Sequence, residues 1–380
     1  MNSRDEQART DAAMMARAIQ LAWRGRFSTH PNPRVGCVIC VGDDVVGEGW
    51  HERAGEPHAE VHALRAAGER ARGATAYVTL EPCSHYGRTP PCADALVKAG
   101  LSRVVVAMTD PNPAVAGRGL KRLRDAGIEV VEGVLSAEAE SLNPGYLYRM
   151  RSGRPLFRVK VAASLDGRTA MASGESQWIT GPAARRDVQR LRAMSDAILT
   201  GVGTILADDP SLTVRPDDMG GLHEAVPPGP QPQRIILDSQ LRTPPTARVL
   251  TTGPVWIFCS EAVADSEAAR ELTARGARIQ PLPGGSGRLN LLDVARAVAE
   301  AGINEVLVEA GPTLAGAVVA AQLADEFWLY QAPVFLGSDG RPTVDLPLAR
   351  MADRKFWKVR DRRQIGDDLR LILTPATVVA

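Results

Sequence analysis

The chain has 380 residues, of which 44% are hydrophobic and 23% charged, and its formal net charge at pH 7 is +1. A single domain typically has about 100–200 residues, so this length predicts two domains. The near-neutral charge argues against a protein built mainly to coat nucleic acid or an anionic membrane. No run of about 18 apolar residues is present, so the sequence predicts no membrane span.

Cysteine usage and the N-terminus indicate a cytoplasmic protein. The five cysteines are an odd and sparse set that suits a reducing compartment, where cysteines bind metal or do chemistry more often than they form disulfides. Residues 1–26 mix acidic and basic side chains and lack the apolar core of a signal peptide.

The first half of the chain alternates strands with helices. A helix is expected over residues 6–24, followed by a β-hairpin whose strands at 34–40 and 45–51 are joined around Gly42. Further helices are expected at 59–71, 93–100 and 119–127, and further strands at 74–80, 102–108 and 128–133. Gly100 and Gly127 stand where helix C-caps belong. This alternation predicts a sheet with helices on its faces.

The pattern restarts after a helical segment at residues 136–153, so we place the domain boundary between residues 152 and 153. The second half predicts helices at 182–195, 264–276, 291–302 and 314–323. Strands are expected at 156–164, 197–201, 234–239, 255–260, 305–310, 326–336, 355–361 and 369–375. Residues 216–233 are rich in proline and glycine and predict a long surface loop.

Two cysteines flank the proline-rich loop EPCSHYGRTPPC, which runs from Glu81 to Cys92. A disulfide, a pair of core thiols or a pair of metal ligands would each look like this locally. Cys83 follows a predicted strand, whereas His58 and Cys92 stand at the starts of predicted helices. Both helix starts would lie at one edge of the sheet, so we expect the three side chains to come together.

One imidazole and two thiolates form a ligand set that zinc favours, and three protein ligands leave a fourth position for water. Helix N-termini also favour thiolates electrostatically. Zinc lowers the pKa of bound water from about 15.7 to about 7. Glu60, two residues beyond His58, is suited to carrying protons rather than to binding the metal. The pattern matches the H-x-E…P-C…C arrangement of zinc-dependent base deaminases.

Each of these residues also has a simpler interpretation. A lone histidine is usually a surface or core residue, and two cysteines can be packed core thiols. The joint occurrence of all the residues in this order favours the metal site. We interpret His62, one turn beyond His58, as structural, and Cys37, Cys40 and Cys259 as buried thiols in predicted strands.

Longer motifs extend this pattern along nearly the whole chain. In the first half they are HPNPRVGCVI, GEPHAEVHAL, VTLEPCSHYGRTPPC and DPNPAVAGRG, and in the second half KVAASLDGRTAMASGESQWIT, ILADDPSLTVR and VEAGPTLAG. Together they closely resemble the bifunctional deaminase–reductase of riboflavin biosynthesis. The cysteine spacing fits this resemblance, because the loop between Cys83 and Cys92 is longer than the P-C-x-x-C spacing of base deaminases in general.

The resemblance implies that residues 1–152 form a three-layer α/β domain of the cytidine-deaminase type that binds Zn²⁺. Its substrate would be a diaminopyrimidinone carrying a phosphoribosylamino group, from which it would hydrolyse the 2-amino group. Glu60 would be catalytic, carrying a proton to the ring nitrogen and then to the departing ammonia.

The same resemblance implies four substrate-binding residues in this domain. Asn32 would hold the base, because an amide both donates and accepts hydrogen bonds; alternatively it forms a turn between prolines. His51, His85 and Arg88 lie in family motifs near the substrate, and Arg88 would contact the phosphate through its guanidinium. Their alternative interpretation is as solvated loop residues.

For residues 153–380 the resemblance implies an α/β domain of the dihydrofolate-reductase type that uses NADPH. It would reduce the ribosyl C1′ of the deaminated product to a ribityl chain, and the protein need only align nicotinamide and substrate and stabilise charge. Lys160 would polarise or protonate the sugar carbonyl oxygen. Alternatively it is a lysine on an exposed strand face.

Further residues of the second domain follow from the family motifs. Arg192 and Arg215 would anchor phosphate, although the other arginines near Arg192 also suit a solvated helix face. The substrate-binding set is Ser176, Arg192, Leu212, Arg215 and Glu309. The cofactor-binding set is Ala162, Trp178, Thr204, Asp208, Gly311, Pro312, Thr313, Leu314, Ala315, Gly316 and Ala317. This last run is a small-residue strand-to-helix turn that suits a dinucleotide, but it does not match G-x-G-x-x-G, so no Rossmann domain is expected.

Two other functions stay open at this point. One is a nucleoside or transfer-RNA base deaminase with an unrelated appended domain; the long loop between Cys83 and Cys92 and the near-neutral charge weigh against it. The other is a structural zinc fold carrying a nucleotide-sensing module, which would need a fourth protein ligand. For the bifunctional enzyme we expect a small phosphorylated pyrimidine as the substrate and a homo-oligomer, because small reductase folds of this kind commonly pair.

Overall fold

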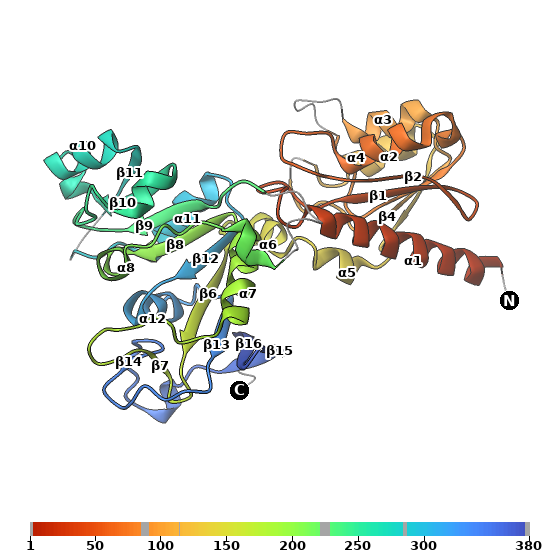
Figure 1. The fold of residues 1–380 in the computed structure, drawn as a ribbon. Coiled ribbons are helices and arrows are strands. Elements are labelled where there is room, and N and C mark those ends of the chain that lie inside the picture. Colours follow the sequence, from red (N-terminus) through yellow and green to blue (C-terminus); the bar gives the residue numbers. More distant parts are fainter. Residues whose placement is uncertain (1–2, 85–90, 114, 221–228, 284–286, 377–380) are drawn as a thin grey trace. The chain divides into compact units, whose positions relative to one another are not determined.

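The structure is a computed structural model that describes residues 3–84, 91–113, 115–220, 229–283 and 287–376. The chain divides into two compact units: the first comprises residues 1–152 together with 222–230, and the second comprises residues 153–221 and 231–380 (Figure 1). In the described part of the chain, no helix is both long and apolar enough to cross a membrane.

The first unit is built on a five-stranded sheet with the order β2-β1-β3-β4-β5. Its strands are β1 (Gly36–Val41), β2 (Asp44–Trp50), β3 (Thr75–Val78), β4 (Arg103–Val106) and β5 (Glu129–Glu132). The predicted hairpin of β1 and β2 is confirmed, with a φ of 59° at Gly42 in its turn. β3, β4 and β5 are parallel to one another, so the loops that follow β3 and β4 leave the sheet at the same edge.

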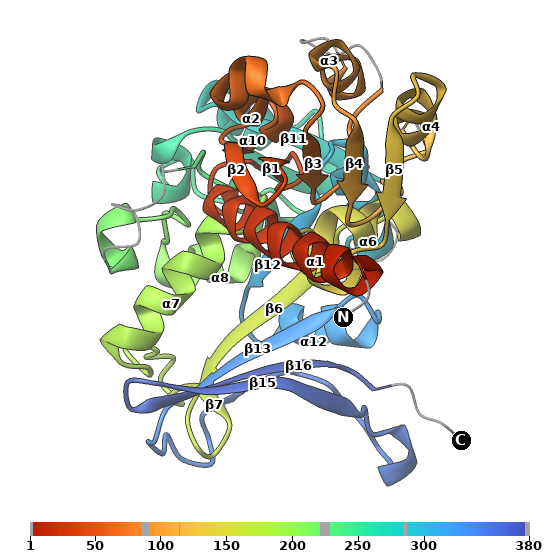
Figure 2. The same cartoon turned by 90° about the vertical axis from the view of Figure 1, so that its right-hand side faces the viewer.

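Helices cover both faces of this sheet (Figures 1 and 2). α2 (Ala59–Ala67), α3 (Cys92–Ala99) and α4 (Arg118–Asp125) cover one face, and α1 (Ser3–Ala22), α5 (Ser136–Glu140) and α6 (Pro144–Ser152) cover the other. Alternate side chains of β1 point to opposite faces, so Cys37 lies in the core under α2 and Cys40 in the core under α1. α2 packs directly on β2, because a Cβ at Gly49 would lie 2.4 Å from the Ala59 carbonyl oxygen.

One predicted helix of this unit is two helices in the structure. The segment predicted at 136–153 is interrupted between α5 and α6, where Asn143 binds the backbone of Arg34. The Arg34 N–H donates to Asn143 Oδ1 at 2.7 Å, and Asn143 Nδ2 donates to the Arg34 carbonyl at 2.9 Å. Pro144 then begins α6, a position where its missing N–H costs nothing.

The second unit is built on a nine-stranded sheet with the order β11-β10-β9-β8-β12-β6-β13-β16-β15. Neighbouring strands are parallel from β11 to β13, whereas β16 and β15 are antiparallel. The parallel strands are β6 (Leu156–Ala163), β8 (Ala197–Gly201), β9 (Gln233–Leu237), β10 (Val255–Ser260), β11 (Ala277–Leu282), β12 (Glu305–Glu309) and β13 (Glu326–Gln331). The antiparallel edge is β15 (Trp357–Ile365) and β16 (Asp368–Pro375), and β7 (Arg168–Ala170) and β14 (Arg341–Pro342) form a separate ribbon.

Helices also cover both faces of the large sheet (Figure 1). The core on one face lies under α11 (Leu291–Glu300) and α12 (Pro312–Ala320). The core on the other face lies under α7 (Pro182–Ala193), α8 (Val202–Asp208) and α10 (Glu267–Ala274). Together with the first unit, these layers confirm the predicted α/β fold class.

Several elements of the second unit differ from the prediction. β11 and α8 were not among the predicted elements: β11 lacks alternation and contains Pro281, and α8 has only seven residues. The helix predicted at 264–276 begins only at Glu267, because the Ser266 side chain caps it by accepting the Ala269 N–H. The strand predicted at 326–336 ends at Gln331, two residues before Pro333.

Candidate active sites

The structure brings His58, Cys83 and Cys92 together in the first unit. Their ligand atoms all lie within 4.8 Å of one another. The His58 Nδ1 is 3.3 Å from the Cys92 Sγ and 3.6 Å from the Cys83 Sγ. His58 is the N-cap of α2 and Cys92 is the first residue of α3, so two helix starts and the loop after β3 meet at this point.

Local chain geometry keeps Cys83 at the start of α3. The Cys92 N–H donates to the Cys83 Sγ at 3.3 Å, and the Ala93 N–H donates to the Cys83 carbonyl at 3.1 Å. Hydrogen bonding from the Cys92 thiol lowers the pKa of Cys83 well below its usual range, although burial opposes this shift. Cys83 therefore favours the thiolate at neutral pH, which is the form that binds metals.

Glu60 lies in the first turn of α2 and is only 3% exposed. Burial raises the pKa of its carboxyl group to about 7. Its Oε2 is buried and has no hydrogen-bond partner within the described ranges. The imidazole and the two cysteine sulfurs fit a zinc ion that keeps one coordination position open for water. The Glu60 oxygen that lacks a partner within these ranges could accept a hydrogen bond from that water.

His51 and Asn32 form a hydrogen-bonded pair beside His58. The His51 Nδ1 is 3.2 Å from the Pro57 carbonyl oxygen, which can only accept, so this nitrogen carries the proton. Burial lowers the pKa of His51 to about 4, so the ring is neutral and its Nε2 accepts from Asn32 Nδ2 at 3.1 Å. The His51 and His58 rings meet edge to face at 5.2 Å. The Asn32 amide is therefore oriented next to the metal cluster.

The other predictions for the first unit have mixed outcomes. His85 and Arg88 lie outside the described residues. Cys37, Cys40 and Cys259, the last in the second unit, are buried free thiols, as predicted. His62 is not part of the metal cluster.

In the second unit, the strand connections diverge between β8 and β12. The chain runs from β8 to β9 on one side of this pair, and from β12 through α12 to β13 on the other side. In open parallel sheets, ligands bind at the carboxyl ends of strands where connections diverge in this way. α8 follows β8 and α12 follows β12, so the predicted cofactor residues Thr204 and 311–317 lie on this edge.

The turn into α12 places helix N–H groups at the same edge. Gly311 is the N-cap of α12 and Pro312 opens its first turn, where N–H groups have no partner inside the helix and favour anions. Ala315 is 1% exposed and its N–H donates to the Gly311 carbonyl, so its side chain belongs to the core. Gly316 has a packing role, because a Cβ there would lie 2.0 Å from the Asp345 carbonyl oxygen.

Lys160, Arg192 and Glu309 form a buried ion cluster next to this edge. The Lys160 Nζ is 3.7 Å from Glu309 Oε2, and the Arg192 Nη2 is 3.0 Å from the same oxygen. Arg192 also donates through Nε to Glu309 Oε1 and through Nη1 to the Thr213 carbonyl, at 2.5 and 3.0 Å. Arg192 therefore does not lie on a solvated helix face, and Lys160 is not an exposed strand lysine.

Burial and the charges within this cluster shift the pKa values of Glu309 and Lys160. Burial would raise the pKa of Glu309, but the charges of Arg192 and Lys160 outweigh burial and bring it to about 2. Burial lowers the pKa of Lys160, and Glu309 only partly opposes this effect. A lysine whose pKa lies below the usual range gives up a proton more readily, which suits a proton donor.

The remaining predicted residues lie on several elements of the second unit. Trp178 is 69% exposed, and the guanidinium of Arg185 lies 4.7 Å from its ring centroid. Arg215 is exposed and pairs with Asp218. Leu212 is 3% exposed with a φ of 52°. The others are Ala162 in β6, Ser176 before Trp178, and Thr204 and Asp208 in α8.

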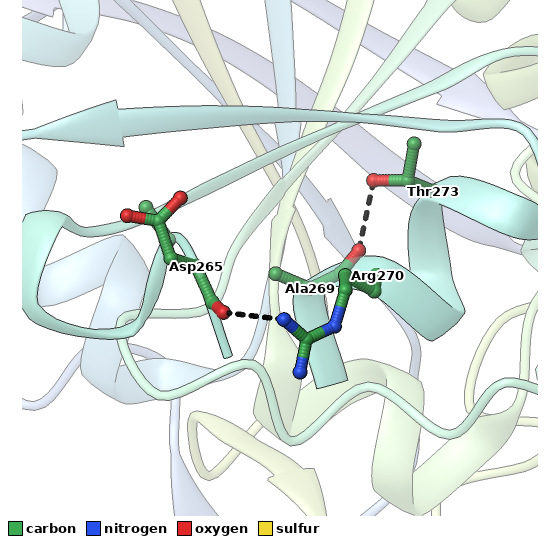
Figure 3. A pocket seen from close by; sticks show the side chains of 5 residues that line it. Asp265, Ala269, Arg270 and Thr273 are labelled. Carbon is green, nitrogen blue, oxygen red and sulfur yellow. Dashed lines mark hydrogen bonds between the residues drawn. The ribbon is translucent and has the colours of Figure 1, made fainter. Parts of the chain in front are cut away.

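A shallow hollow beside α10 carries none of the predicted site residues (Figure 3). It is lined by Ala264, Asp265, Ala269, Arg270 and Thr273. Arg270 donates to the Asp265 carbonyl and Thr273 to the Ala269 carbonyl, so these polar groups are already bonded to the chain. We assign it no ligand.

Two family models match the chain in agreement with this chemistry. Residues 8–108 match the cytidine and deoxycytidylate deaminase zinc-binding region, and residues 155–370 match the RibD C-terminal domain. The class of protein is therefore a zinc-binding deaminase joined to a reductase.

Comparisons over the whole chain identify the family. The chain is 54% identical over 371 residues to the riboflavin biosynthesis protein RibD of Escherichia coli K12, covering 96% of this chain and 100% of that one. It superposes on Acinetobacter baumannii RibD with a TM-score of 0.89 at 47% identity, covering 97% of this chain and 100% of the other. A deaminase/reductase from Thermotoga maritima gives a TM-score of 0.83 at 30% identity, with the same coverage. The chain belongs to the RibD family: it is a bifunctional deaminase and reductase of riboflavin biosynthesis that uses zinc and NADPH.

Proposed function

We propose that the enzyme first hydrolyses the 2-amino group of 2,5-diamino-6-(5-phosphoribosylamino)pyrimidin-4(3H)-one. It then reduces the ribosyl group of the product to ribityl with NADPH. The Thermotoga maritima relative is a diaminohydroxyphosphoribosylaminopyrimidine deaminase and 5-amino-6-(5-phosphoribosylamino)uracil reductase. The observation that carries the first step is the close approach of His58, Cys83 and Cys92 beside a buried Glu60 oxygen that lacks a partner.

In the deaminase unit, residues 1–152, His58, Cys83 and Cys92 hold zinc. When bound, zinc supplies hydroxide near neutral pH, because it lowers the pKa of the water it holds. Glu60 transfers one proton from the attacking water to the ring nitrogen and then a second proton to the departing ammonia; its raised pKa suits a group that both accepts and donates. Asn32 holds the pyrimidine edge, and His51 keeps the Asn32 amide oriented. His85 and Arg88 complete the substrate contacts, with Arg88 at the phosphate.

In the reductase unit, residues 153–380, opening of the ribosyl ring to a ribityl chain takes a hydride from NADPH at C1′ and a proton from the protein at the ring oxygen, as the bond between C1′ and that oxygen breaks. Lys160 supplies the proton, and Glu309 holds its ammonium in place. Ser176, Arg192, Leu212, Arg215 and Glu309 bind the substrate. Arg192 binds the substrate from within the ion cluster, where its guanidinium also donates to Glu309 and to the Thr213 carbonyl.

The cofactor lies at the edge where the β8 and β12 connections diverge. The N–H groups in the first turn of α12 suit a phosphate of NADPH. The residues that we assign to the cofactor are Ala162, Trp178, Thr204, Asp208 and 311–317. Within this run, Ala315 and Gly316 contribute through backbone and packing, because both are buried.

We further propose that the enzyme works in the cytoplasm as a homo-oligomer. All five cysteines are free thiols, as expected in a reducing compartment. β15 is the last strand of the nine-stranded sheet, and an edge strand of nine residues suits pairing with a second copy. Sedimentation of the purified protein tests this assembly, and a monomer at all concentrations would contradict it.

One assay of the full chain tests the proposed reactions. The diaminopyrimidinone substrate and NADPH are supplied together, and ammonia and NADPH absorbance are followed in the same sample. We expect one ammonia and one oxidised NADPH per substrate, with ammonia appearing first. Ammonia from cytidine or from adenosine-containing RNA, without release from this substrate, would contradict the proposal.

A further inference from the structure

Glu81 is a buried carboxylate two residues before Cys83. It is 4% exposed, and no ion pair with it occurs within the described ranges. Its oxygens instead accept four backbone N–H groups. Oε1 accepts those of Gly119 and Leu120 at 2.9 and 3.4 Å, and Oε2 accepts those of Asp110 and Gly117 at 3.2 and 2.9 Å.

These donors belong to the loop after β4 and to the start of α4. The first N–H groups of a helix have no partner inside the helix and carry partial positive charge, so a carboxylate is stabilised there. Within the described ranges, the hydrogen-bond partners of both Glu81 oxygens are backbone N–H donors. An amide at this position would turn its own N–H₂ group toward other donors, so the site is specific for a carboxylate.

The same contact brings two backbones unusually close. A Cβ at Gly119 would lie 2.0 Å from the Pro82 carbonyl oxygen and 3.2 Å from Glu81 Oε1. The Glu81 N–H also donates to the Met108 carbonyl at 3.0 Å. The segment that ends in Cys83 is thus fastened to the loop after β4 through both the backbone and the side chain of Glu81.

Cys83 is held from two directions as a result. The start of α3 holds it on one side, through the Ala93 N–H and the Cys92 N–H. Glu81 and α4 hold it on the other side, through Pro82. The loop after β4 is itself braced, because the Asp110 carboxylate accepts the Tyr146 hydroxyl at 2.8 Å.

We propose that Glu81 is a positioning residue of the deaminase site: its carboxylate fixes the Cys83 sulfur where His58 and Cys92 share a metal with it. This inference rests on the metal site proposed above. Glu81 does not touch the metal or the substrate, and it acts through the placement of Cys83. Substituting a residue that holds a metal ligand in place typically lowers metal affinity by about 10–100-fold.

The test compares metal retention by full-length variants. In Glu81→Gln we expect zinc to be lost to a competing chelator at about tenfold lower chelator concentration than in the wild type. We also expect the thiolate-to-metal absorption of the Co²⁺-loaded protein to shift. NADPH oxidation with the deaminated substrate should stay unchanged. Wild-type zinc retention and an unchanged Co²⁺ spectrum in Glu81→Gln would overturn the proposal.

Asp11→Asn is the matched control. Asp11 is also a buried carboxylate of the first unit, but it accepts two hydrogen bonds from Arg103 at the start of β4, the end opposite the Glu81 loop. We expect a lower unfolding temperature with normal zinc retention and a normal Co²⁺ spectrum. Equal metal loss in Asp11→Asn would show a general effect of instability and overturn the proposal.

A second variant covers the case in which Glu81→Gln does not fold. Gly119→Ala keeps the Glu81 carboxylate but pushes the Pro82 backbone away from α4, so we expect the same direction of change in zinc retention and in the Co²⁺ spectrum. Normal retention in this variant would overturn the proposal. A wild-type chain without stoichiometric zinc would instead contradict the metal site itself.

Discussion

Lys160 and Glu309 occupy paired positions on the adjacent parallel strands β6 and β12, and the Lys160 Nζ lies 3.7 Å from Glu309 Oε2. Arg192 reaches the same carboxylate from α7. One buried anion therefore balances two buried cations. In a medium of low dielectric constant, neither cation can lose this partner without a large cost.

Replacing Glu309 with Gln should weaken both stability and reduction. Breaking a buried ion pair from one side typically costs about 3–5 kcal/mol, because the partner charge stays buried. We expect a loss of about this size in the free energy of unfolding of the reductase unit, measured by urea denaturation, together with slower NADPH oxidation. Arg296→Gln, which removes an exposed pair with Asp293, should leave both unchanged. Normal stability in Glu309→Gln would contradict the ion cluster.

The same cluster predicts how stability falls in acid. The pKa of Glu309 is lowered from 4.5 to about 2 in the folded protein. Its stabilising contribution is therefore complete above pH 4.5 and is lost as the pH falls from 4.5 toward 2. Acid unfolding of the wild type should steepen in this window relative to Glu309→Gln. Parallel curves for the two proteins would contradict the assigned pKa shift.

Glu60→Gln should abolish deamination and spare reduction. The amide cannot take up and return a proton, so ammonia release should fall by about 100-fold or more. NADPH oxidation with the deaminated substrate should stay normal, because that reaction occurs in the other unit. Glu56→Gln is the matched control, since Glu56 is an exposed acid in the same segment. Deamination at the normal rate in Glu60→Gln would refute the role of this carboxylate.

Metal removal should separate the two activities in the same way. The cluster of His58, Cys83 and Cys92 is the one metal-binding group that the described residues form. Dialysis against a strong chelator should stop ammonia release and leave NADPH oxidation intact, and added Zn²⁺ should restore the first activity. Cys92→Ser should lower zinc content measured by atomic absorption. Full zinc content in that variant would place the metal elsewhere.

His51→Phe should impair deamination through Asn32. The substitution fills similar space but removes the acceptor of the Asn32 Nδ2 hydrogen bond, so the amide loses its fixed orientation. We expect kcat/KM for deamination to fall about tenfold, which corresponds to roughly 1.4 kcal/mol. Because Asn32→Ala removes the same interaction, the double variant should be little worse than the more affected single variant. If the fold-loss of kcat/KM in the double variant equals the product of the two single losses, the two residues act independently.

The sequence predicted that His58, Cys83 and Cys92 come together, because the signal for this cluster is local. The identity of each ligand, and its position at the start of a helix or after a strand, can be seen along the chain at His58, Cys83 and Cys92. The alternation of strands and helices also predicted the α/β class. Local patterns failed where an element was short or irregular: α8 and β11 were missed, and the helix predicted at 136–153 is broken by contacts of Asn143 with distant Arg34.

The sequence by itself determined the chemistry that each segment carries, since residue type and local periodicity depend only on neighbours along the chain. Tertiary structure alone decided that Glu309 meets Lys160 and Arg192, and that Glu81 meets the start of α4. Strand order and register decide which of these side chains come into contact. They depend on how whole faces of sheets and helices pack, and segments far apart in the chain supply those faces.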